Sequence, residues 1–372
     1  MNIMSVVGAR PNFVKIAPLL REMRKHGDIC PFLVNTGQHY DANMADQFFR
    51  ELQIPQPDVS LEVGSGSHAC QTAEVMRRLE PILESVRPDA VVVVGDVNST
   101  LAAAVTAAKL RVPVAHVEAG LRSFDRGMPE EVNRVVTDAI ADHLFVTEES
   151  ARRNLLNEGI PEEKIFLVGN VMIDSLEGYR GSWEASRVRD QLGLLHGAYG
   201  VMTLHRPSNV DDPSALAGLL RAVSEVAREL PVVFPCHPRT RARITELNGL
   251  AAGLKRRASR DDTTGVRCVE PLGYLDFMAL VASARIVLTD SGGLQEETAV
   301  LGVPCLTLRE NTERPVTVTH GTNRVVGTSP ARIVEEAFRV IRAARPAPSR
   351  PPLWDGKTSE RIVAILRDRL RG

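Results

Sequence analysis

The feature of this sequence that most constrains its fold is a short apolar run, followed by a helical pattern, that recurs along nearly the whole chain. In the first half these runs lie at 3–7, 32–34, 90–94, 113–117, 144–146 and 165–168. In the second half they lie at 199–204, 232–234, 267–269, 285–288 and 305–308. Buried strands that alternate with amphipathic helices are typical of parallel sheets. The sequence therefore predicts an α/β protein.

The length of the chain predicts about two domains, because 372 residues exceed what one hydrophobic core usually serves. Residues 171–198 carry no strong strand pattern, and we interpret them as the passage between the domains. We expect two Rossmann-like domains, 1–170 and 171–354, that face each other across a cleft. A proline-rich linker precedes a final helix from about Ser359 to Leu370, and we expect 355–372 to cross back to the first domain.

Composition excludes several classes of partner. The formal charge is −1 and the pI is about 6.8, so nothing indicates nucleic acid or an anionic membrane, and the basic run 255–257 is interpreted as a solvated surface. The 5 cysteines are widely spaced and form no Cys-x-x-Cys pair, which argues against a disulfide framework or a zinc site. The first residues lack a basic signal-peptide region, and no apolar run reaches membrane-spanning length. We expect a cytoplasmic globular protein.

The stretch from Leu288 to Glu297 combines a strand end, a glycine turn and the start of a helix. The paired glycines Gly292 and Gly293 let a ligand approach the backbone, and a helix start offers unpaired N–H groups with a partial positive charge. This combination suits a phosphate or pyrophosphate, and the carboxylates one turn later suit sugar hydroxyls. The alternative is an ordinary strand–turn–helix connection that Asp290 or Ser291 caps.

Three carboxylates follow strand ends in the first half: Asp96, Glu118 and one of Glu130 and Glu131. Strand ends of a parallel sheet meet at one edge, so we expect these acids to converge. Close carboxylates push their pKa values apart, which suits removal of a carbon-bound proton coupled to protonation of a leaving group. The alternative for each residue is a solvated loop acid.

Several cations and histidines stand at the same predicted edges. Arg10 and Lys15 follow the first strand and suit a phosphate. His205 and His237 each end a strand of the second half, where either a site role or a structural role is open. Arg314 precedes a proline in a loop and is either a site cation or a surface turn residue. The opening has neither Gly-x-Gly-x-x-Gly nor a P-loop, which weakens dinucleotide binding and disfavours NTP hydrolysis.

Together these residues resemble the non-hydrolysing UDP-N-acetylglucosamine 2-epimerases. The resemblance runs in order from residue 1 to about 330. The motifs that carry it are Gly8-Ala9-Arg10-Pro11 with Lys15, Gly95-Asp96, His116-Val117-Glu118-Ala119-Gly120-Leu121-Arg122, Met128-Pro129-Glu130-Glu131-Val132-Asn133-Arg134, Leu204-His205-Arg206-Pro207, Asp290-Ser291-Gly292-Gly293-Leu294-Gln295-Glu296-Glu297 and Thr312-Glu313-Arg314-Pro315.

The resemblance implies a fold like that of GT-B glycosyltransferases, usually dimeric, with the active site in the cleft. It implies inversion of C2 in a UDP-linked 2-acetamido sugar without NAD or metal: UDP is eliminated to leave a bound glycal and is then re-added. By position, Asp96, Glu118 and Glu130 become the catalytic carboxylates, with His205 also implicated. The assignment of acid and base among them stays open. The implied substrate contacts are Arg10, Ser291, Gly292 and Gly293 on the diphosphate, Glu297 on the ribose, and Lys15, Asn133, Arg134, His237 and Arg314 as further binding residues.

The chain departs from many bacterial members at two places. Those members carry Gln-His-Arg in a region linked to a second, activating UDP-N-acetylglucosamine, whereas this chain has Gln38-His39-Tyr40-Asp41, and its loop from Arg122 to Pro129 is short. Both departures weaken the expectation of allosteric activation. At these two places the sequence resembles a branch of the family that includes epimerases of UDP-2,3-diacetamido-2,3-dideoxyglucuronic acid.

The function that we expect is the reversible conversion of UDP-N-acetylglucosamine to UDP-N-acetylmannosamine, with a UDP-sugar as the small-molecule partner. The alternatives are the diacetamido-uronic acid substrate, a glycosyltransferase on the same fold, or a catalytically silent nucleotide-sugar sensor.

Overall fold

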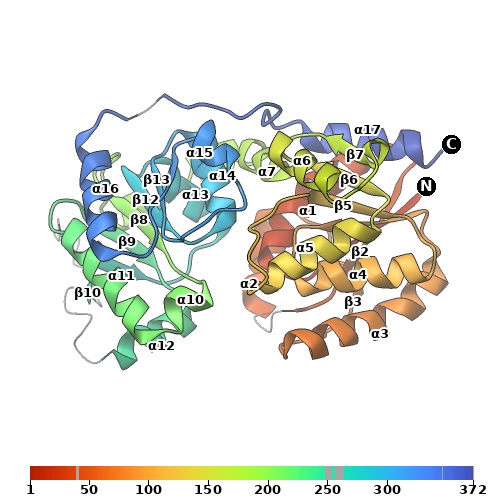
Figure 1. Cartoon of the computed structure of the whole chain (residues 1–372), viewed down its shortest axis with the longest axis horizontal. Helices are drawn as coiled ribbons and strands as arrows, with labels where there is room; N and C mark the ends of the chain where they lie inside the picture. Colours follow the sequence, from red (N-terminus) through yellow and green to blue (C-terminus); the bar gives the residue numbers. More distant parts are fainter. Residues whose placement is uncertain (39–41, 248–253, 256–263, 346, 372) are drawn as a thin grey trace. The chain divides into compact units, whose positions relative to one another are not determined.

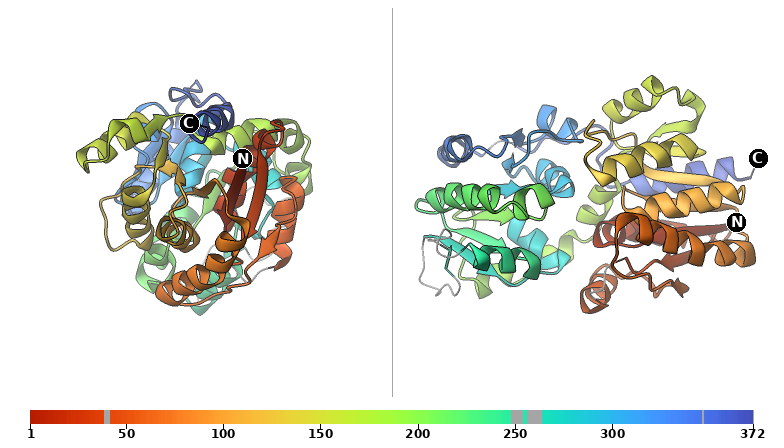
Figure 2. Two further views of the ribbon diagram at one scale, coloured as in Figure 1. Left: turned by 90° about the vertical axis from the view of Figure 1, so that its right-hand side faces the viewer. Right: turned by 60° about the horizontal axis from the view of Figure 1, so that its bottom comes forward.

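The computed structural model describes residues 1–38, 42–247, 254–255, 264–345 and 347–371, and the chain separates into two compact units (Figure 1). Unit 1 comprises Met1–Gly178 and Pro352–Gly372, and unit 2 comprises Tyr179–Pro351. In each unit the helices lie outside a parallel sheet (Figure 2). The prediction of an α/β chain with two parallel-sheet domains is confirmed.

Unit 1 contains a parallel sheet of 7 strands in the order β3-β2-β1-β4-β5-β6-β7. The strands are β1 (Asn2–Val7), β2 (Cys30–Asn35), β3 (Val59–Ser60), β4 (Ala90–Val94), β5 (Val114–Ala119), β6 (His143–Val146) and β7 (Ile165–Leu167). The helices are α1 (Arg10–Met23), α2 (Ala42–Glu51), α3 (His68–Val86), α4 (Asn98–Lys109), α5 (Pro129–Ile140), α6 (Glu149–Asn157), α7 (Val171–Gly178) and α17 (Thr358–Arg369), with a 3₁₀ turn at Glu162–Lys164. Every residue of β4 and β5 is buried, as expected of central strands with helices on both faces.

Unit 2 contains a second parallel sheet of 7 strands in the order β10-β11-β9-β8-β12-β13-β14. The strands are β8 (Gly200–Thr203), β9 (Val232–Pro235), β10 (Leu254–Lys255), β11 (Val266–Val269), β12 (Ile286–Thr289), β13 (Cys305–Thr307) and β14 (Asn323–Val325). The helices are α8 (Arg180–Glu184), α9 (Val188–Gln191), α10 (Pro207–Val210), α11 (Pro213–Val226), α12 (Pro238–Glu246), α13 (Tyr274–Ala282), α14 (Gly292–Leu301), α15 (Val316–Thr319) and α16 (Pro330–Arg342).

The final helix returns to unit 1, as predicted. Helix α17 packs on α1 and α7. Asp174 of α7 accepts hydrogen bonds from the backbone N–H groups of Thr358 (3.0 Å) and Ser359 (2.6 Å), so it caps the unpaired donors at the start of α17. The segment before the helix is fixed by Trp354, which is buried and donates from Nε1 to the carbonyl of Thr147 at 3.0 Å.

The strand pattern predicted from the sequence is confirmed except at sheet edges. The three strands that it missed, β3, β10 and β14, are short, and each lies at the edge of its sheet. Contacts divide the chain after α7 and before Pro352, and the expected boundaries at 170/171 and 354/355 stay predictions. Residues 39–41 of the departing motif and 256–257 of the basic run lie outside the described residues.

Two local expectations from residue type need correction. Threonine often caps helices, so the sequence favours Thr147 as the N-cap of α6, but Glu148 occupies that position and the Thr147 carbonyl accepts from Trp354. The sequence also favours a helix that begins at Glu296 after the glycine turn, but α14 begins at Gly292, so the paired glycines form its first turn. Of the helices in the described ranges, none is both long enough and apolar enough to span a bilayer.

Candidate active site

Each sheet has one place where the strand order reverses direction, and the predicted site residues gather there. In unit 1 the reversal falls between β1 and β4, and in unit 2 it falls between β8 and β12. Loops that leave the carboxyl ends of these strand pairs diverge to opposite faces and open a crevice, which is where open α/β sheets bind ligands. The two sets are described separately below.

In unit 1, Lys15 and Glu118 form a buried ion pair. The ammonium of Lys15, on α1, lies 2.8 Å from Oε1 and 2.7 Å from Oε2 of Glu118 at the end of β5. Glu118 has a φ of 73°, a left-handed conformation that L side chains rarely adopt and that often marks a functional position. A Cβ at Gly95 would lie 2.8 Å from the Lys15 ammonium, so glycine is needed there. The structure thus brings together two residues that are distant in sequence.

Asp96, directly after β4, is held by two residues of α5. Its Oδ2 accepts from Nε (3.0 Å) and Nη2 (2.8 Å) of Arg134, and its backbone carbonyl accepts from the Asn133 amide at 2.8 Å. Arg134 is almost fully buried, whereas the Asp96 side chain is 20% exposed. Charge-assisted hydrogen bonds from a guanidinium favour the ionised carboxylate. Asp96 is therefore an oriented carboxylate that a ligand can still reach.

The structure separates Glu130 from Glu131, which the sequence left open. Glu131 is buried and accepts from the backbone N–H groups of Ser123 and Phe124, both at 2.9 Å, and from Arg134 at 2.6 Å. It therefore fastens the loop between β5 and α5. Glu130 is half-exposed in the first turn of α5. This leaves Glu130 as the better candidate for contact with a ligand, and its catalytic role stays a prediction.

The turn after β1 is organised by Asn12, which the sequence did not single out. Its Oδ1 accepts from the N–H groups of Gly8 (3.1 Å) and Ala9 (3.2 Å), and its amide donates to the carbonyl of Val94 at 2.8 Å. It thus joins the carboxyl ends of β1 and β4 on either side of the strand-order reversal. Arg10 begins α1 beside this turn, with its guanidinium carbon 6.0 Å from the centre of the Phe48 ring.

In unit 2, His205 and Asp290 form a pair across the strand-order reversal. His205 follows β8 and is 55% exposed, and its Nδ1 lies 2.8 Å from Oδ1 of buried Asp290, which follows β12. Asp290 also accepts from the backbone N–H of Arg206 at 2.9 Å and from the Asn209 amide at 3.2 Å. Burial alone raises the pKa of Asp290, but the attraction of His205 and these hydrogen bonds outweigh it and lower that pKa. Because the acceptor is ionised, Nδ1 carries the proton and Nε2 is the nitrogen that titrates.

The first turn of α14 lies against a cluster of opposite charges. A Cβ at Gly292 would lie 2.5 Å from Nη1 of Arg314 and 2.8 Å from Oε1 of Glu313, so glycine lets both side-chain ends approach the helix backbone closely. Arg314 donates to Glu296 (2.8 Å) and to Glu313 (2.6 Å). Arg309 donates to Glu313 at 2.8 Å. The guanidinium of Arg314 is thereby fixed beside the helix N-terminus, a combination that suits a phosphate.

Glu297 lies one turn into α14 and is buried, and no cation of the described residues is among the groups that shift its pKa. Burial raises its pKa to about 8, although the nearby Tyr274 hydroxyl acts in the opposite direction. Within the described part of the chain, Oε1 of Glu297 and the hydroxyl of Tyr274 have no hydrogen-bond partner of ordinary geometry. Buried polar atoms are normally satisfied, so these two are candidates for hydrogen bonds to a ligand.

His237 is exposed and lies after β9. Sequence reasoning did not single out Tyr274 and Glu313, which act on the predicted residues Glu297 and Arg314, or Asn12, which organises the turn before Arg10. For Tyr274 the sequence carries no local signal. Glu313 belongs to the motif Thr312-Glu313-Arg314-Pro315, and it forms a direct ion pair with Arg314.

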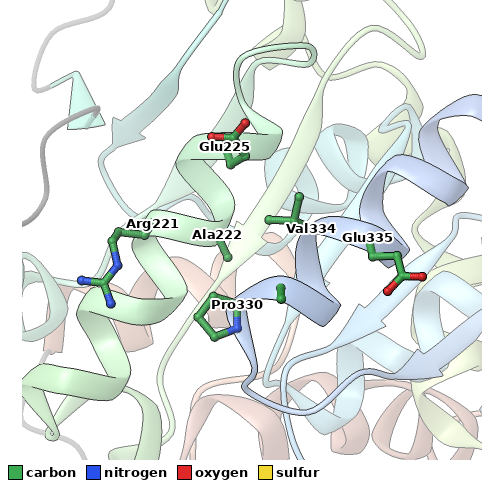
Figure 3. A pocket seen from close by; sticks show the side chains of 7 residues that line it. Arg221, Ala222, Glu225, Pro330, Val334 and Glu335 are labelled. Atoms are coloured by element: carbon green, nitrogen blue, oxygen red, sulfur yellow. The ribbon is translucent and has the colours of Figure 1, made fainter.

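A surface hollow of about 470 Å³ lies in unit 2 between α11 and α16 (Figure 3). Its lining is Arg221, Ala222, Glu225, Pro330, Ala331, Val334 and Glu335. None of the predicted site residues belongs to this lining, and its three charged side chains, Arg221, Glu225 and Glu335, point away from one another in the close-up. We therefore do not assign the site to this hollow.

Comparison with known proteins gives consistent matches over the whole chain. A family model described as UDP-N-acetylglucosamine 2-epimerase matches residues 21–367. The UDP-N-acetylglucosamine 2-epimerase of Methanocaldococcus jannaschii is 42% identical over 371 residues, 98% of this chain and 99% of that protein. The UDP-2,3-diacetamido-2,3-dideoxy-D-glucuronate 2-epimerase of Pseudomonas aeruginosa is 41% identical over 341 residues, 91% of each chain. The crystal structure of the M. jannaschii enzyme in complex with UDP-GlcNAc and UDP has a TM-score of 0.90, with 41% identity and coverage of 99% of this chain and 100% of that one.

Proposed function

The chain belongs to the UDP-N-acetylglucosamine 2-epimerase family, and from that premise we propose that it interconverts UDP-N-acetylglucosamine and UDP-N-acetylmannosamine by elimination and re-addition of UDP. It is an isomerase that acts on a nucleotide sugar. The observation that carries the proposed mechanism is the pair of cation-held carboxylates, Asp96 and Glu118, at the strand-order reversal of unit 1.

The reaction as proposed needs a base for the C2 proton and an acid for its return. A carboxylate takes the proton from C2, the C–H electrons form the C1=C2 double bond, and the C1–O electrons leave with the diphosphate of UDP. UDP then adds back to C1 of the 2-acetamidoglucal while a proton reaches the opposite face of C2. Inversion therefore requires two proton-transfer groups on opposite faces, for which Asp96, Glu118 and Glu130 are the candidates.

The paired cations have a defined part in this chemistry. Arg134 and Lys15 hold the carboxylates of Asp96 and Glu118 in fixed orientations. In the proposed cycle, transfer of the C2 proton to Glu118 weakens its attraction to Lys15, which favours return of the proton in the second half-reaction. Which acid serves which face stays open, since a cation holds each of the two carboxylates.

We propose that unit 2 holds the UDP of the same substrate. The backbone N–H groups at Ser291, Gly292 and Gly293 and the guanidinium of Arg314 would bind the diphosphate, with Arg10 of unit 1 assisting. Glu297 would accept or share hydrogen bonds with the ribose hydroxyls, which would satisfy its buried Oε1. His205, with Asp290 on Nδ1, is suited to donate from Nε2 to the oxygen that leaves C1.

The proposal is tested by incubation with UDP-N-acetylglucosamine in D₂O, followed by NMR. We expect a mannose-configured nucleotide sugar and deuterium at C2 of both epimers. Product without deuterium would contradict proton abstraction at C2. Product that forms only with an added acceptor would favour a glycosyltransferase, and tight UDP-sugar binding without turnover would favour a sensor.

Variants test the division of roles between the units. Asp96→Asn and Glu118→Gln should lower turnover by about 10²-fold or more while UDP binding persists. Arg314→Met should weaken UDP binding as well as turnover. If Asp96→Asn abolished UDP binding instead, its role would be structural.

A second substrate is supported by similarity to the P. aeruginosa enzyme, which is nearly as high as that to the M. jannaschii enzyme. UDP-2,3-diacetamido-2,3-dideoxyglucuronic acid differs from UDP-N-acetylglucosamine at C3 and C6 but not at C2, so the same acids could act on either. Comparison of kcat/KM for the two compounds decides between them. A ratio above about tenfold in favour of one identifies the substrate.

We further propose a cytoplasmic homodimer that works without NAD or metal. The Cys30, Cys70, Cys236, Cys268 and Cys305 side chains are free thiols, as suits a reducing compartment. Helix α5 and the loop before it expose Val132, Val136 and Phe124, an apolar surface that a second copy would cover. Light scattering of the purified protein should give twice the chain mass, and Val136→Glu should give a monomer. Activity should survive dialysis against EDTA.

A further inference from the structure

A buried histidine and aspartate lie behind the predicted catalytic acids of unit 1 and take no part in the mechanism above. His116 is on β5 and Asp138 is on α5, and both are completely buried. Nδ1 of His116 lies 2.6 Å from Oδ1 of Asp138, and Nε2 lies 2.8 Å from the carbonyl oxygen of Gly95. Both nitrogens of the ring therefore face an acceptor.

The partners of His116 fix the orientation of its ring. The carbonyl oxygen of Gly95 can only accept, so Nε2 donates to it. Burial alone raises the pKa of Asp138, but His116 and Arg122 outweigh it and lower that pKa. The ring is therefore held between an acceptor on the turn after β4 and a carboxylate on α5.

The second oxygen of Asp138 is equally occupied. Oδ2 accepts from the backbone N–H of Gly120 at 3.0 Å and lies 2.7 Å from Nη1 of Arg122. Arg122 in turn donates twice to Glu158, at 2.7 Å each. The charged groups in this network are thus Asp138 of α5, Arg122 of the loop between β5 and α5, and Glu158 directly after α6.

The network connects the segments that carry the three predicted acids. His116 holds the carbonyl of Gly95, the residue before Asp96. Asp138 holds the N–H of Gly120, two residues after Glu118. Asp138 of α5 contacts both His116 and Gly120, so it links both turns to this helix, whose first turn contains Glu130. Gly120 has little room to move, because a Cβ there would lie 2.5 Å from the carbonyl oxygen of Ala151.

We propose that the His116–Asp138 pair is a positioning device that fixes the two turns bearing Asp96 and Glu118 against α5. The effect on kcat rests on the proposed acid–base roles of these residues. Misplacement of a catalytic group by about 1 Å lowers rates by about 10²-fold, so a buried pair that sets two backbone turns acts strongly on kcat.

A merely structural pair would behave differently from a positioning pair. Apolar replacement of a buried ion pair is often neutral or stabilising. We therefore expect the double variant His116→Phe/Asp138→Leu to fold, with UDP affinity within about twofold of wild type, because the proposed UDP contacts lie in unit 2. We expect its kcat to fall by at least about tenfold. A folded double variant with wild-type kcat overturns the proposal.

Asp138→Asn provides the matched conservative variant. Its amide can donate to Nδ1 of a neutral His116, and its oxygen can still accept from Gly120 and Arg122, so every hydrogen bond survives without the charges. We expect kcat within about fivefold of wild type, well above that of the double variant. Equal losses in both variants would mean that the charge, not the positioning, matters, and would overturn the proposal.

A direct reading of the ring does not depend on activity. In protein with ¹⁵N-labelled histidine, we expect the Nε2–H proton of His116 to be protected from exchange with solvent, because the buried ring donates to the Gly95 carbonyl, and to stay protected in Asp138→Asn. An Nε2–H proton of the wild type that exchanges as fast as that of an exposed histidine overturns the proposal. If no UDP-sugar were epimerised at all, the proposed function would fail while this spectrum stayed as expected, so the two failures are distinguishable.

Discussion

At the scale of single residues, the fold gives neighbouring acids opposite charge states. Asp290 is almost fully buried and Glu297 fully buried, yet the pKa of Asp290 is lowered and that of Glu297 is raised to about 8. The difference lies in their partners among the described residues: Asp290 has an imidazole and several N–H donors, whereas a tyrosine hydroxyl and a second carboxylate, Glu296, act on Glu297. Burial favours the neutral form unless donors or cations compensate.

The first prediction concerns the pH dependence of stability at Glu297. Its ordinary pKa of 4.5 applies to the unfolded chain, and about 8 applies to the folded one. Below pH 4.5 the Glu297 carboxyl is neutral in both the folded and the unfolded chain. Between pH 4.5 and about pH 8 it is ionised only in the unfolded chain, so the stability that it contributes falls as pH rises and is lost at about pH 8. Glu297→Gln has no such proton. Its free energy of unfolding, minus that of the wild type, should therefore rise by up to about 4 kcal/mol from about pH 5 to about pH 8.

The measurement is urea unfolding of both proteins at each pH, with Glu246→Gln, an exposed acid of the same unit, as control. All other titrating groups are common to the proteins and cancel in the difference. A difference that stays constant with pH would show that Glu297 is ionised in the folded protein.

The second prediction concerns Asp290, which we expect to act through His205. In Asp290, Oδ1 faces His205 and Oδ2 accepts from the backbone N–H of Arg206. In Asp290→Asn one of these oxygens becomes an amide donor, so one of the two contacts is lost. We expect kcat to fall by at least about tenfold. In a His205→Asn background the same substitution should have little further effect, because the partner is already gone. Losses that multiply across the double-mutant cycle would instead show two independent roles.

At the scale of elements, the central strands and long helices were predictable from hydrophobic periodicity. β4 is a continuous apolar run because helices cover both of its faces, and β5 is buried throughout although it includes His116 and Glu118. The sequence did not predict β3, β10 and β14, because each has only two or three residues and lies at a sheet edge. Such short segments leave no periodic pattern of hydrophobic residues. Their pairing depends on the neighbouring strand, which local sequence does not specify.

For the candidate site, the residue types at strand ends were predictable, but their partners were not. Glu130 and Glu131 are adjacent and chemically alike, and only the path of the preceding loop decides that Glu131 accepts from Ser123 and Phe124. Asp138 lies in the last turn of α5, where an acid is usually solvated, and tertiary packing alone places it against His116. The roles of the predicted residues in catalysis stay predictions.

The third prediction concerns the first turn of α14. Gly292→Ala would place a methyl group 2.5 Å from Nη1 of Arg314 and should displace that guanidinium from the helix N-terminus. We expect UDP affinity to fall by at least about tenfold, as for loss of a charged hydrogen bond. The matched control is Gly218→Ala in α11, where the nearest atom, of Pro330, is 3.5 Å away. That change should leave binding intact and stabilise the helix by about 0.5–1 kcal/mol.

Calorimetric titration with UDP measures the first effect and thermal unfolding the second. Unchanged UDP affinity in a folded Gly292→Ala protein would mean that Arg314 does not contact the diphosphate.

At the scale of the whole molecule, the two units differ in how the chain builds them. Unit 2 is one continuous segment, Tyr179–Pro351, with a core of its own along β8, β9 and β12. Unit 1 needs both ends of the chain, because Trp354, Ile362 and Leu366 of its last segment are buried. Truncation before Pro352 therefore removes part of the unit 1 core, but leaves unit 2 complete.

The fourth prediction follows from this difference. The isolated segment 179–351 should fold cooperatively and bind UDP, since it contains Asp290, Glu297 and Arg314. Its affinity should be weaker than that of the full chain by about tenfold, because the assisting Arg10 belongs to unit 1. It should not exchange the C2 proton of UDP-N-acetylglucosamine with D₂O, because it lacks Asp96 and Glu118.

Calorimetry measures the binding and NMR measures the exchange, with Glu297→Ala in the segment as the control that should lose binding. A segment that folds but does not bind UDP would show that unit 1 contributes most of the diphosphate site, and the roles proposed for Ser291, Gly292 and Arg314 would have to be reassigned.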